Sequence, residues 1–556
     1  MTRREILQGA AGLGATAALS SVASAQSGES RSMPKPTPTP PAAPVPASRL
    51  FHTVETRSGK IQGISNVGIV SFKGIPYGAP TGGANRFMPP RPAKPWAGVR
   101  DGTGYGQINP QVPADLRSDY ARLIMWDRNV GPGGMGEDCL NLNVWTPGVD
   151  GQKRAVMVCY HGGGFSSGSG NSPGFDGAAM ARFGDVVVVT VNHRLASLGY
   201  THLGDLTNDR DFATSGVVGV MDMAAALEWV RDNIAAFGGD PGRVMIFGQS
   251  GGGAKTSVLL GNPAAKGLFH RAAVQSGSML RLTERDVATR HAEALLEELG
   301  LDRRRIADLQ KVPWQTLLEA QTRAMRRPGM GWSFVPVLDG TYLTSHPFDP
   351  AAPEVSRDVP MIVSTTLEDA AIRFMNYDVT EEELAKSFAS RYGERSAALI
   401  GTYRRLYPKK SPFLLQSVIA TDASQRRAAI KQAELKAAQG GAPVWMYQWD
   451  WPVSAYDGKF GAIHGVDVSA SFYNVRDQML DVGDARGKKV ADEFASAWVA
   501  FAKTGNPNSD ILPQWDPYDA TRRATMIFDD KTRAEDDPRS GLRKLWAAMP
   551  ETPLGG

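Results

Sequence analysis

The sequence predicts an α/β fold in which a large, mostly parallel central sheet carries helices on both faces and an antiparallel edge at its N-terminal side. Three continuous apolar runs are of the kind that a parallel sheet buries on both faces: residues 155–160, 186–191 and 244–247. Between the last two runs, apolar side chains recur at helical spacing over residues 221–237 and stop at Gly238. Short apolar stretches broken by glycine and proline over residues 53–109 predict the antiparallel edge.

The second half of the chain mixes both kinds of pattern. Apolar residues at helical spacing predict four helices, at residues 286–299, 312–325, 380–407 and 488–504. Short apolar runs predict two further strands, at residues 360–364 and 443–448. We expect residues 49–556 to form one elaborated domain around the sheet.

The N-terminal residues indicate export. Arg3 and Arg4 precede a Gly/Ala-rich run up to Ala25, which is typical of a twin-arginine signal peptide over residues 1–25. A membrane helix is less favoured, because the apolar run is too short to cross a bilayer core of about 30 Å. Residues 26–48 are rich in proline and predict an extended, disordered spacer. We therefore expect a periplasmic or secreted protein with no stable membrane anchor in its mature form.

Composition excludes several classes of function. Hydrophobic residues make up 42% and charged residues 21% of the 556, which is ordinary for a soluble protein. The formal net charge is only +4 and no basic cluster is interleaved with aromatic residues, so we expect no nucleic-acid partner. There is no CxxC pair, HExxH motif or cluster of ligands at metal-binding spacing, so neither a metal nor a cofactor is expected. Cys139 and Cys159 are expected to be unpaired, because Cys159 lies in an apolar run typical of a buried strand.

The pattern Gly-x-Ser-x-Gly occurs three times, around Ser166, Ser172 and Ser250. The residue after a catalytic serine must offer its backbone N–H, and Pro173 has none. Ser166 has no helix-forming run behind it. Only Ser250 follows a predicted strand and precedes a predicted helix, the arrangement that lifts a nucleophilic hydroxyl onto a sharp turn above a parallel sheet.

Several further motifs resemble the type B carboxylesterase/lipase family, the cholinesterase-like branch of the α/β-hydrolases. The resemblance covers nearly the whole chain after the spacer and implies an α/β-hydrolase catalytic domain. It is carried by Phe-Lys-Gly-Ile-Pro-Tyr at 72–77, Glu-Asp-Cys-Leu-Asn-Leu-Asn-Val-Trp at 137–145, His-Gly-Gly-Gly-Phe at 161–165, Asn-His-Arg-Leu at 192–195, Phe-Gly-Gly-Asp-Pro at 237–241 and Phe-Ala-Lys-Thr-Gly-Asn-Pro-Asn at 501–508.

The resemblance implies a Ser-Asp-His triad. Ser250 matches the nucleophile, and His464 matches the base that must remove its proton. An acid that orients the imidazole should follow a strand between these two positions. Matching by position gives Asp369, although the family usually has Asp-Glu-Gly where this chain has Glu-Asp-Ala, so Glu368 remains the alternative. A loop histidine that merely caps a turn is the less favoured interpretation of His464.

By the same resemblance, the backbone amides of Gly163, Gly164 and Gly251 would form the oxyanion hole. Glycine allows the backbone to approach a substrate closely. The family generally has alanine at position 251 and glutamate at position 249, where this chain has Gln249. His161 is expected to support the glycine loop, and no catalytic role is expected for it.

Two more departures from the family pattern concern the region before residue 145. The family pairs Cys139 with an upstream cysteine that this chain lacks. Trp126 resembles the aromatic residue that binds the choline cation in cholinesterases, but its offset from Cys139 differs, so we prefer a packing role.

The sequence therefore predicts an exported serine hydrolase that cleaves a small-molecule carboxylic ester through an acyl-enzyme. A non-catalytic binding protein on the same fold is one alternative. Hydrolysis of amides, lactones or thioesters is another, because a Ser-Asp-His triad permits these reactions equally.

Overall fold

A 13-stranded sheet forms the centre of the computed structural model, which describes residues 50–113, 123, 134–330, 334–474, 480 and 483–550. Its middle strands run parallel to their neighbours in the order β7-β6-β8-β9-β10-β11-β12. These strands are β6 (Arg154–Tyr160), β7 (Val187–Val191), β8 (Gly239–Gln249), β9 (Arg271–Gln275), β10 (Met361–Thr366), β11 (Val444–Trp449) and β12 (Ala524–Phe528). The mostly parallel sheet predicted from the apolar runs is thus confirmed.

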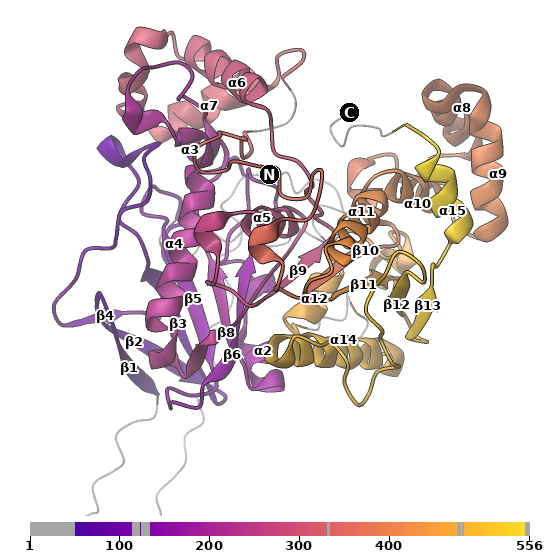
Figure 1. The fold of residues 1–556 in the computed structure, drawn as a ribbon, viewed down its shortest axis with the longest axis horizontal. Coiled ribbons are helices and arrows are strands. Elements are labelled where there is room, and N and C mark those ends of the chain that lie inside the picture. Colours follow the sequence, from indigo (N-terminus) through magenta and orange to yellow (C-terminus); the bar gives the residue numbers. More distant parts are fainter. Residues whose placement is uncertain are drawn as a thin grey trace, which may run out of the picture. The chain divides into compact units, whose positions relative to one another are not determined.

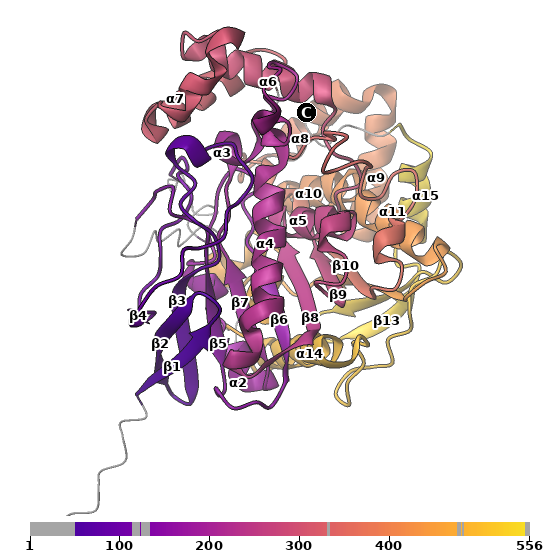
Figure 2. The same cartoon turned by 60° about the vertical axis from the view of Figure 1, so that its left-hand side comes forward.

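Antiparallel strands lie at both edges of the sheet (Figure 2). The N-terminal edge, which the sequence predicts, comprises β1 (Phe51–Thr56), β2 (Gly59–Asn66), β3 (Ile69–Pro76) and β5 (Asn141–Thr146), with β4 (Val99–Asp101) paired parallel to β2. The far edge is β13 (Arg533–Asp536), antiparallel to β12. This second antiparallel edge was not predicted.

Helices cover both faces of the sheet, as predicted. Alternate side chains of β6 enter two separate hydrophobic clusters, because successive residues of a strand point to opposite faces. The cluster that contains Val156 is completed by α3 (Ala196–Tyr200), α4 (Val218–Asn233), α5 (Gly251–Leu260), α6 (Arg285–Glu298), α7 (Trp314–Met325) and α11 (Gln425–Ala438). The cluster that contains Met157 is completed by α2 (Ala178–Gly184), α8 (Glu381–Tyr392), α9 (Ser396–Leu406), α10 (Pro412–Ala423), α12 (Asp467–Ser471), α14 (Ala485–Thr504) and α15 (Ser540–Ala547) (Figure 1).

Local sequence explains where most helices end. After α4 the chain tightens into a 3-10 turn, Ile234–Phe237, which Gly238 stops at φ +78°. The single helix predicted over residues 380–407 is wrong: Gly393 adopts φ +58° and a 3-10 turn separates α8 from α9. Helices α10 and α11 were not predicted. Most of α10 is buried, so its apolar residues show no one-sided helical spacing.

Cys139 and Cys159 are buried and free, as predicted. The Cys139 sulfur lies 3.9 Å from Oδ1 of Asn109, in the loop where the resemblance leads one to look for a partner cysteine. Trp126 and the signal and spacer expected over residues 1–48 lie outside the described residues. Within the described residues, none of the helices has the length and apolar character to cross a membrane.

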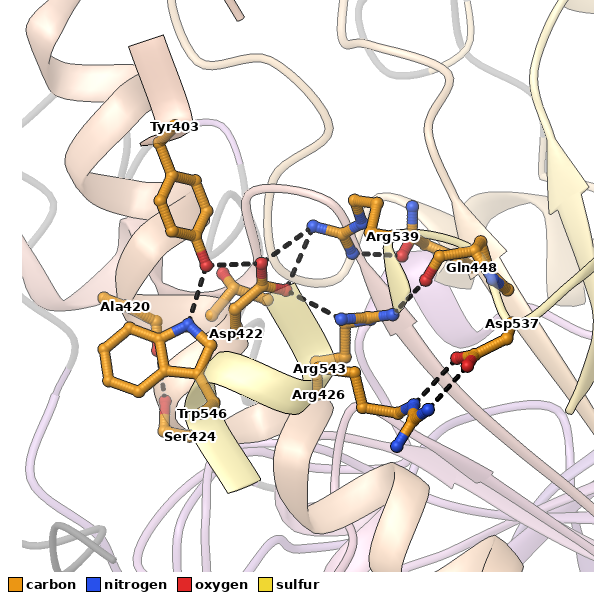
Figure 3. A network of polar contacts seen from close by, with 12 residues as sticks. Tyr403, Ala420, Asp422, Ser424, Arg426, Gln448, Asp537, Arg539, Arg543 and Trp546 are labelled. Atoms are coloured by element: carbon orange, nitrogen blue, oxygen red, sulfur yellow. Dashed lines mark hydrogen bonds and ion pairs between the residues drawn. The ribbon is translucent and has the colours of Figure 1, made fainter. Parts of the chain in front are cut away.

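A buried charged network ties the C-terminal segment to α10 (Figure 3). The Asp422 carboxylate lies 3.0 Å from the guanidinium of Arg539 and 3.5 Å from that of Arg426. The Tyr403 hydroxyl donates to Asp422 at 2.7 Å and itself accepts from Trp546 at 2.7 Å. Because Asp422 is almost fully buried, this carboxylate is held between two cations and shielded from water.

The network matters for the site because α10 also holds the loop after β10. The hydroxyl of Thr421, next to Asp422, accepts a 2.8 Å hydrogen bond from the backbone N–H of Ala370. The C-terminal segment therefore braces the loop that carries Asp369.

Replacing Asp422 by asparagine should lower the free energy of unfolding by about 3–5 kcal/mol, because Arg426 and Arg539 would be left as buried cations without a counter-charge. Urea unfolding midpoints would measure the change. Asp286→Asn, which removes one partner of an exposed ion pair with Arg290, is the control and should leave the urea midpoint nearly unchanged, because water screens that pair. Equal effects of the two substitutions would contradict a stabilising role for the network.

Candidate active site

Ser250 occupies a sharp turn between β8 and α5, as the sequence predicts. Its backbone has φ +59° and ψ −122°, a combination that costs a non-glycine residue roughly 1–3 kcal/mol and is maintained only by surrounding structure. Part of that support is a 2.8 Å hydrogen bond from its N–H to the carbonyl of Gln275 at the end of β9. Ser166 lies in a turn and Ser172 caps a short 3-10 helix, so neither follows a strand of the sheet.

Glycines after Ser250 allow close contacts with neighbouring backbone. A β-carbon on Gly252 would lie 2.0 Å from the carbonyl oxygen of Tyr160, so only glycine fits there. A β-carbon on Gly251 would lie 2.4 Å from the nitrogen of Gly164 and 2.3 Å from its oxygen. The backbones of Gly164 and Gly251 are therefore in direct contact, which explains why alanine, usual in the family at this position, would need a rearrangement here.

The glycine loop presents two unengaged amides. Gly163 and Gly164 have φ values of +89° and +63°, which glycine adopts without a steric penalty. Among the described residues, none accepts a hydrogen bond from either N–H. Gly164 and Gly251 line the same cavity as Ser250, whereas Gly163 is not among the lining residues.

His464 pairs with Asp369. The imidazole Nδ1 hydrogen-bonds to Oδ1 of Asp369, which is completely buried at the start of a 3-10 turn, Asp369–Arg373. The other carboxylate oxygen accepts from the backbone N–H of Thr366 at 3.3 Å. This arrangement fixes the imidazole and leaves its Nε2 for another partner.

Glu368 has a different task. Its carboxylate contacts the Lys410 ammonium and accepts a 2.8 Å hydrogen bond from the N–H of Ala462. Its own N–H donates to the Ala462 carbonyl at 3.1 Å. Glu368 thus anchors the loop that carries His464 and makes no contact with the imidazole among its described hydrogen bonds.

Ser250 and His464 face one cavity of about 380 Å³. The two residues come from loops 214 positions apart along the chain, obtained as 464 minus 250. Their meeting follows from the sheet: β8, β9, β10 and β11 are parallel neighbours, so the loops at their carboxyl ends gather at one edge.

A buried lysine supports the glycine loop. The Lys255 ammonium, on α5, donates a 2.8 Å hydrogen bond to the carbonyl of His161, directly before the glycines. Burial lowers the pKa of Lys255 to about 7. His161 stacks on His193 with ring centroids 4.9 Å apart, and burial lowers the pKa of His193 well below its usual value. The two histidines therefore pack against each other beside the glycine loop. This agrees with the expectation that His161 supports that loop.

A second buried carboxyl group lies behind the pair of Asp369 and His464. Asp467 accepts hydrogen bonds from Tyr447 at 2.7 Å and Gln275 at 3.0 Å. Burial is the main cause that raises the pKa of Asp467 to about 6, and the nearby charge of Asp369 raises it further. Sequence reasoning did not single out Asp467 or Lys255, because only the folded chain brings them beside the site.

Gln249 separates the glycine loop from the loop of His464. Its Oε1 would lie 3.5 Å from a β-carbon on Gly162 and 3.4 Å from one on Gly465. Its Nε2 is buried and makes no hydrogen bond to the described residues. A neutral amide therefore stands beside the base, where a glutamate would place a fixed negative charge.

Within the described residues, no group of three or more His, Cys, Asp or Glu side chains is placed to hold a metal ion.

Comparison with known proteins identifies the family. A sequence model of the Carboxylesterase family matches residues 51–546. The para-nitrobenzyl esterase of Bacillus subtilis (strain 168) is 36% identical over 504 residues, which are 88% of this chain and 97% of that protein. The fumonisin B1 esterase of Sphingopyxis macrogoltabida is 32% identical over 490 residues, 85% of each chain. A crystal structure of a carboxylesterase from Geobacillus stearothermophilus superposes with a TM-score of 0.74 at 34% identity, covering 89% of this chain and 99% of the other. The chain has the α/β-hydrolase fold and belongs to the carboxylesterase family.

Proposed function

We propose that this carboxylesterase works through an acyl-enzyme formed on Ser250. The observation that carries the proposal is the buried hydrogen bond between Asp369 and His464, at the wall of the cavity onto which Ser250 opens. A fixed imidazole facing a serine on a strained turn is the arrangement that activates a hydroxyl for attack on an acyl group.

In the proposed reaction, His464 accepts the Ser250 proton as the hydroxyl oxygen attacks the ester carbonyl. The oxyanion is held by the amides of Gly163, Gly164 and Gly251, each of which is worth about 3 kcal/mol of barrier in comparable enzymes. His464 returns the proton to the departing alcohol, and water then releases the acid by the same steps. Asp369 orients the imidazole and stabilises its charged form.

The substrate is proposed to be a small-molecule ester. Relatives named for hydrolysis of para-nitrobenzyl esters and of fumonisin B1 support this class. The cavity of about 380 Å³ is of a size that encloses a small organic molecule.

Ser250→Ala should lower the turnover of p-nitrophenyl acetate by at least roughly 10⁴-fold, because the attacking hydroxyl is lost. A fluorinated phosphonate should label the wild-type protein at Ser250 and leave the variant unlabelled, as read by peptide mass spectrometry. Turnover by the variant at the wild-type rate would refute the assignment of the nucleophile.

Asp369→Asn should reduce kcat by roughly 10³- to 10⁴-fold, because an amide cannot stabilise the imidazolium and favours the wrong tautomer. The matched control is Glu368→Gln, which alters the neighbouring carboxylate that binds Lys410 and the loop backbone. It should cost no more than about tenfold. The opposite ranking of the two variants would assign the acid to Glu368.

We further propose that residues 1–25 direct export through the twin-arginine route, which would make the mature protein periplasmic or secreted. The Arg3-Arg4 pair and the small residues up to Ala25 support this. Expressed in a bacterium with that pathway, the protein should be recovered from the periplasm or medium with its N-terminus near Gln26. Replacing both arginines by lysine should block export, and unchanged export of that variant would contradict the proposed route.

A further inference from the structure

Four polar side chains line the cavity and have no role in the reaction proposed above. They are Ser276, Ser278, Arg373 and Gln425, and Gln425 already accepts a hydrogen bond from the Ser424 hydroxyl. The positions of the first three follow from the same sheet edge that gathers the reacting groups, because Ser276 and Ser278 follow β9 and Arg373 follows β10, the two strands that come after β8 in the sheet order.

The segment that carries the two serines is packed directly against the proposed nucleophile. A β-carbon on Gly277 would lie 2.1 Å from the carbonyl oxygen of Ser250. Ser276 has a left-handed backbone at φ +48°, and its N–H donates to the Ser364 carbonyl at 3.0 Å. The segment is thus hydrogen-bonded to β10 through Ser276 and packed against the turn of Ser250 at Gly277.

Within the described residues, neither serine hydroxyl has a hydrogen-bond partner. Oγ of Ser276 and Oγ of Ser278 are buried in the wall of the cavity that these residues line. Ser276 is only 7% exposed. Buried hydroxyls in folded proteins are almost always hydrogen-bonded, so the two serines retain hydrogen-bonding capacity beside the cavity.

Arg373 supplies a positive charge to the same cavity. Arg373 is solvent-exposed, its guanidinium donates to the Ser424 hydroxyl at 3.4 Å, and no ion pair joins it to a carboxylate in the described part of the chain. The carboxylate whose charge acts on it is Asp369, which is already engaged by His464. A guanidinium presents several N–H donors in a plane and matches a carboxylate better than a lysine would.

The other side chains of the lining are mostly apolar, with Phe165, Ala254, Met279, Ile372 and Ala428 around the polar groups. A matching substrate has an apolar body, an ester at Ser250 and an anionic oxygen group. With a single cation in the lining and the carboxylate of Asp369 nearby, a singly charged group fits better than a doubly charged one.

We propose that Arg373, Ser276 and Ser278 form a subsite for a carboxylate group carried by the substrate. The enzyme therefore prefers esters with a free carboxylate. These are either monoesters of dicarboxylic acids or hydroxy acids whose hydroxyl group is acylated and whose carboxylate is free. This inference rests on the proposed function, because the bound carboxylate must place an ester carbonyl next to Ser250.

Two matched substrate pairs test the subsite. In p-nitrophenyl hydrogen adipate the carboxylate is on the acyl side, and in 4-acetoxybenzoate it is on the leaving-group side; the methyl ester of each is the neutral partner. We expect kcat/KM to favour the carboxylate form in at least one pair. Arg373→Gln should lower kcat/KM for that form by about 10- to 100-fold and change the neutral ester by less than about threefold.

Further variants separate direct binding from indirect effects. Arg373→Lys should retain part of the preference, and Ser276→Ala or Ser278→Ala should reduce it by smaller factors. Arg391→Gln is the matched control: its charge also acts on Arg373, but it does not line the cavity, so the preference should stay within about twofold. Phosphonate labelling at Ser250 checks that each variant is folded.

The possible outcomes are distinct. Equal losses for charged and neutral esters in Arg373→Gln would show that Arg373 only supports Asp369, and would overturn the subsite. A wild type that is labelled at Ser250 and hydrolyses the methyl esters without preferring the carboxylate forms would also overturn the subsite but leave the proposed function intact. A wild type that is neither labelled nor active on any of the four esters would overturn the proposed function, and the substrate role of the subsite with it.

Discussion

The rest of the site depends on the buried contact between Asp369 and His464. A carboxylate without exposure to water is costly unless it is hydrogen-bonded, and here it receives the imidazole on one oxygen and a backbone N–H on the other. The contact fixes the imidazole beside the cavity. In the proposed reaction, the strained turn at Ser250 and the unengaged amides of the glycine loop would lack a positioned base without this contact.

The loops that form the site are supported at three points. Glu368 and Lys410 anchor the loop of His464, and Thr421 on α10 holds the backbone next to Asp369. On the other side, Lys255 fixes the start of the glycine loop. Because α10 is itself clamped by the Asp422 network, the C-terminal segment stabilises a site to which it contributes no reacting group.

Helix α11 connects the cavity to that network. Its first turn contributes Gln425 and Ala428 to the lining of the cavity, and Arg426 between them binds Asp422. The helix therefore faces the substrate with one side and the buried charges with another. A change in the charged network would thus reach the lining of the cavity through this helix.

Much of the fold could be predicted from the sequence, because long apolar runs and helical spacing identify strands buried on both faces and one-sided helices. The turn at Ser250 was predicted for the same reason. Helix α10 was not predicted, because a helix that is buried on most sides does not have apolar residues on one face only. The family resemblance supplied Asp369 and His464, but it left Glu368 as an alternative, since two adjacent carboxylates cannot be distinguished until the backbone shows which one points at the imidazole.

The polar residues of the proposed subsite could not be assigned a role from the sequence. Ser276 and Ser278 lie in the stretch Gln275-Ser276-Gly277-Ser278, which is part of the family resemblance, but only the fold places them with Arg373 at the wall of one cavity. Lys255 and Asp467 could not be predicted as buried residues of the site either. Charged residues are mostly exposed, so from the sequence alone both are expected at the surface, whereas the fold buries them.

The most direct measurement is a crystal structure of the protein after reaction with a phosphonate inhibitor. Phosphorus should be bonded to the Ser250 oxygen, with the phosphoryl oxygen roughly 2.7–3.1 Å from the amides of Gly164 and Gly251 and His464 Nε2 within hydrogen-bonding distance of the adduct. An adduct on another residue, or an imidazole turned away from a phosphorylated Ser250, would contradict the proposed reaction.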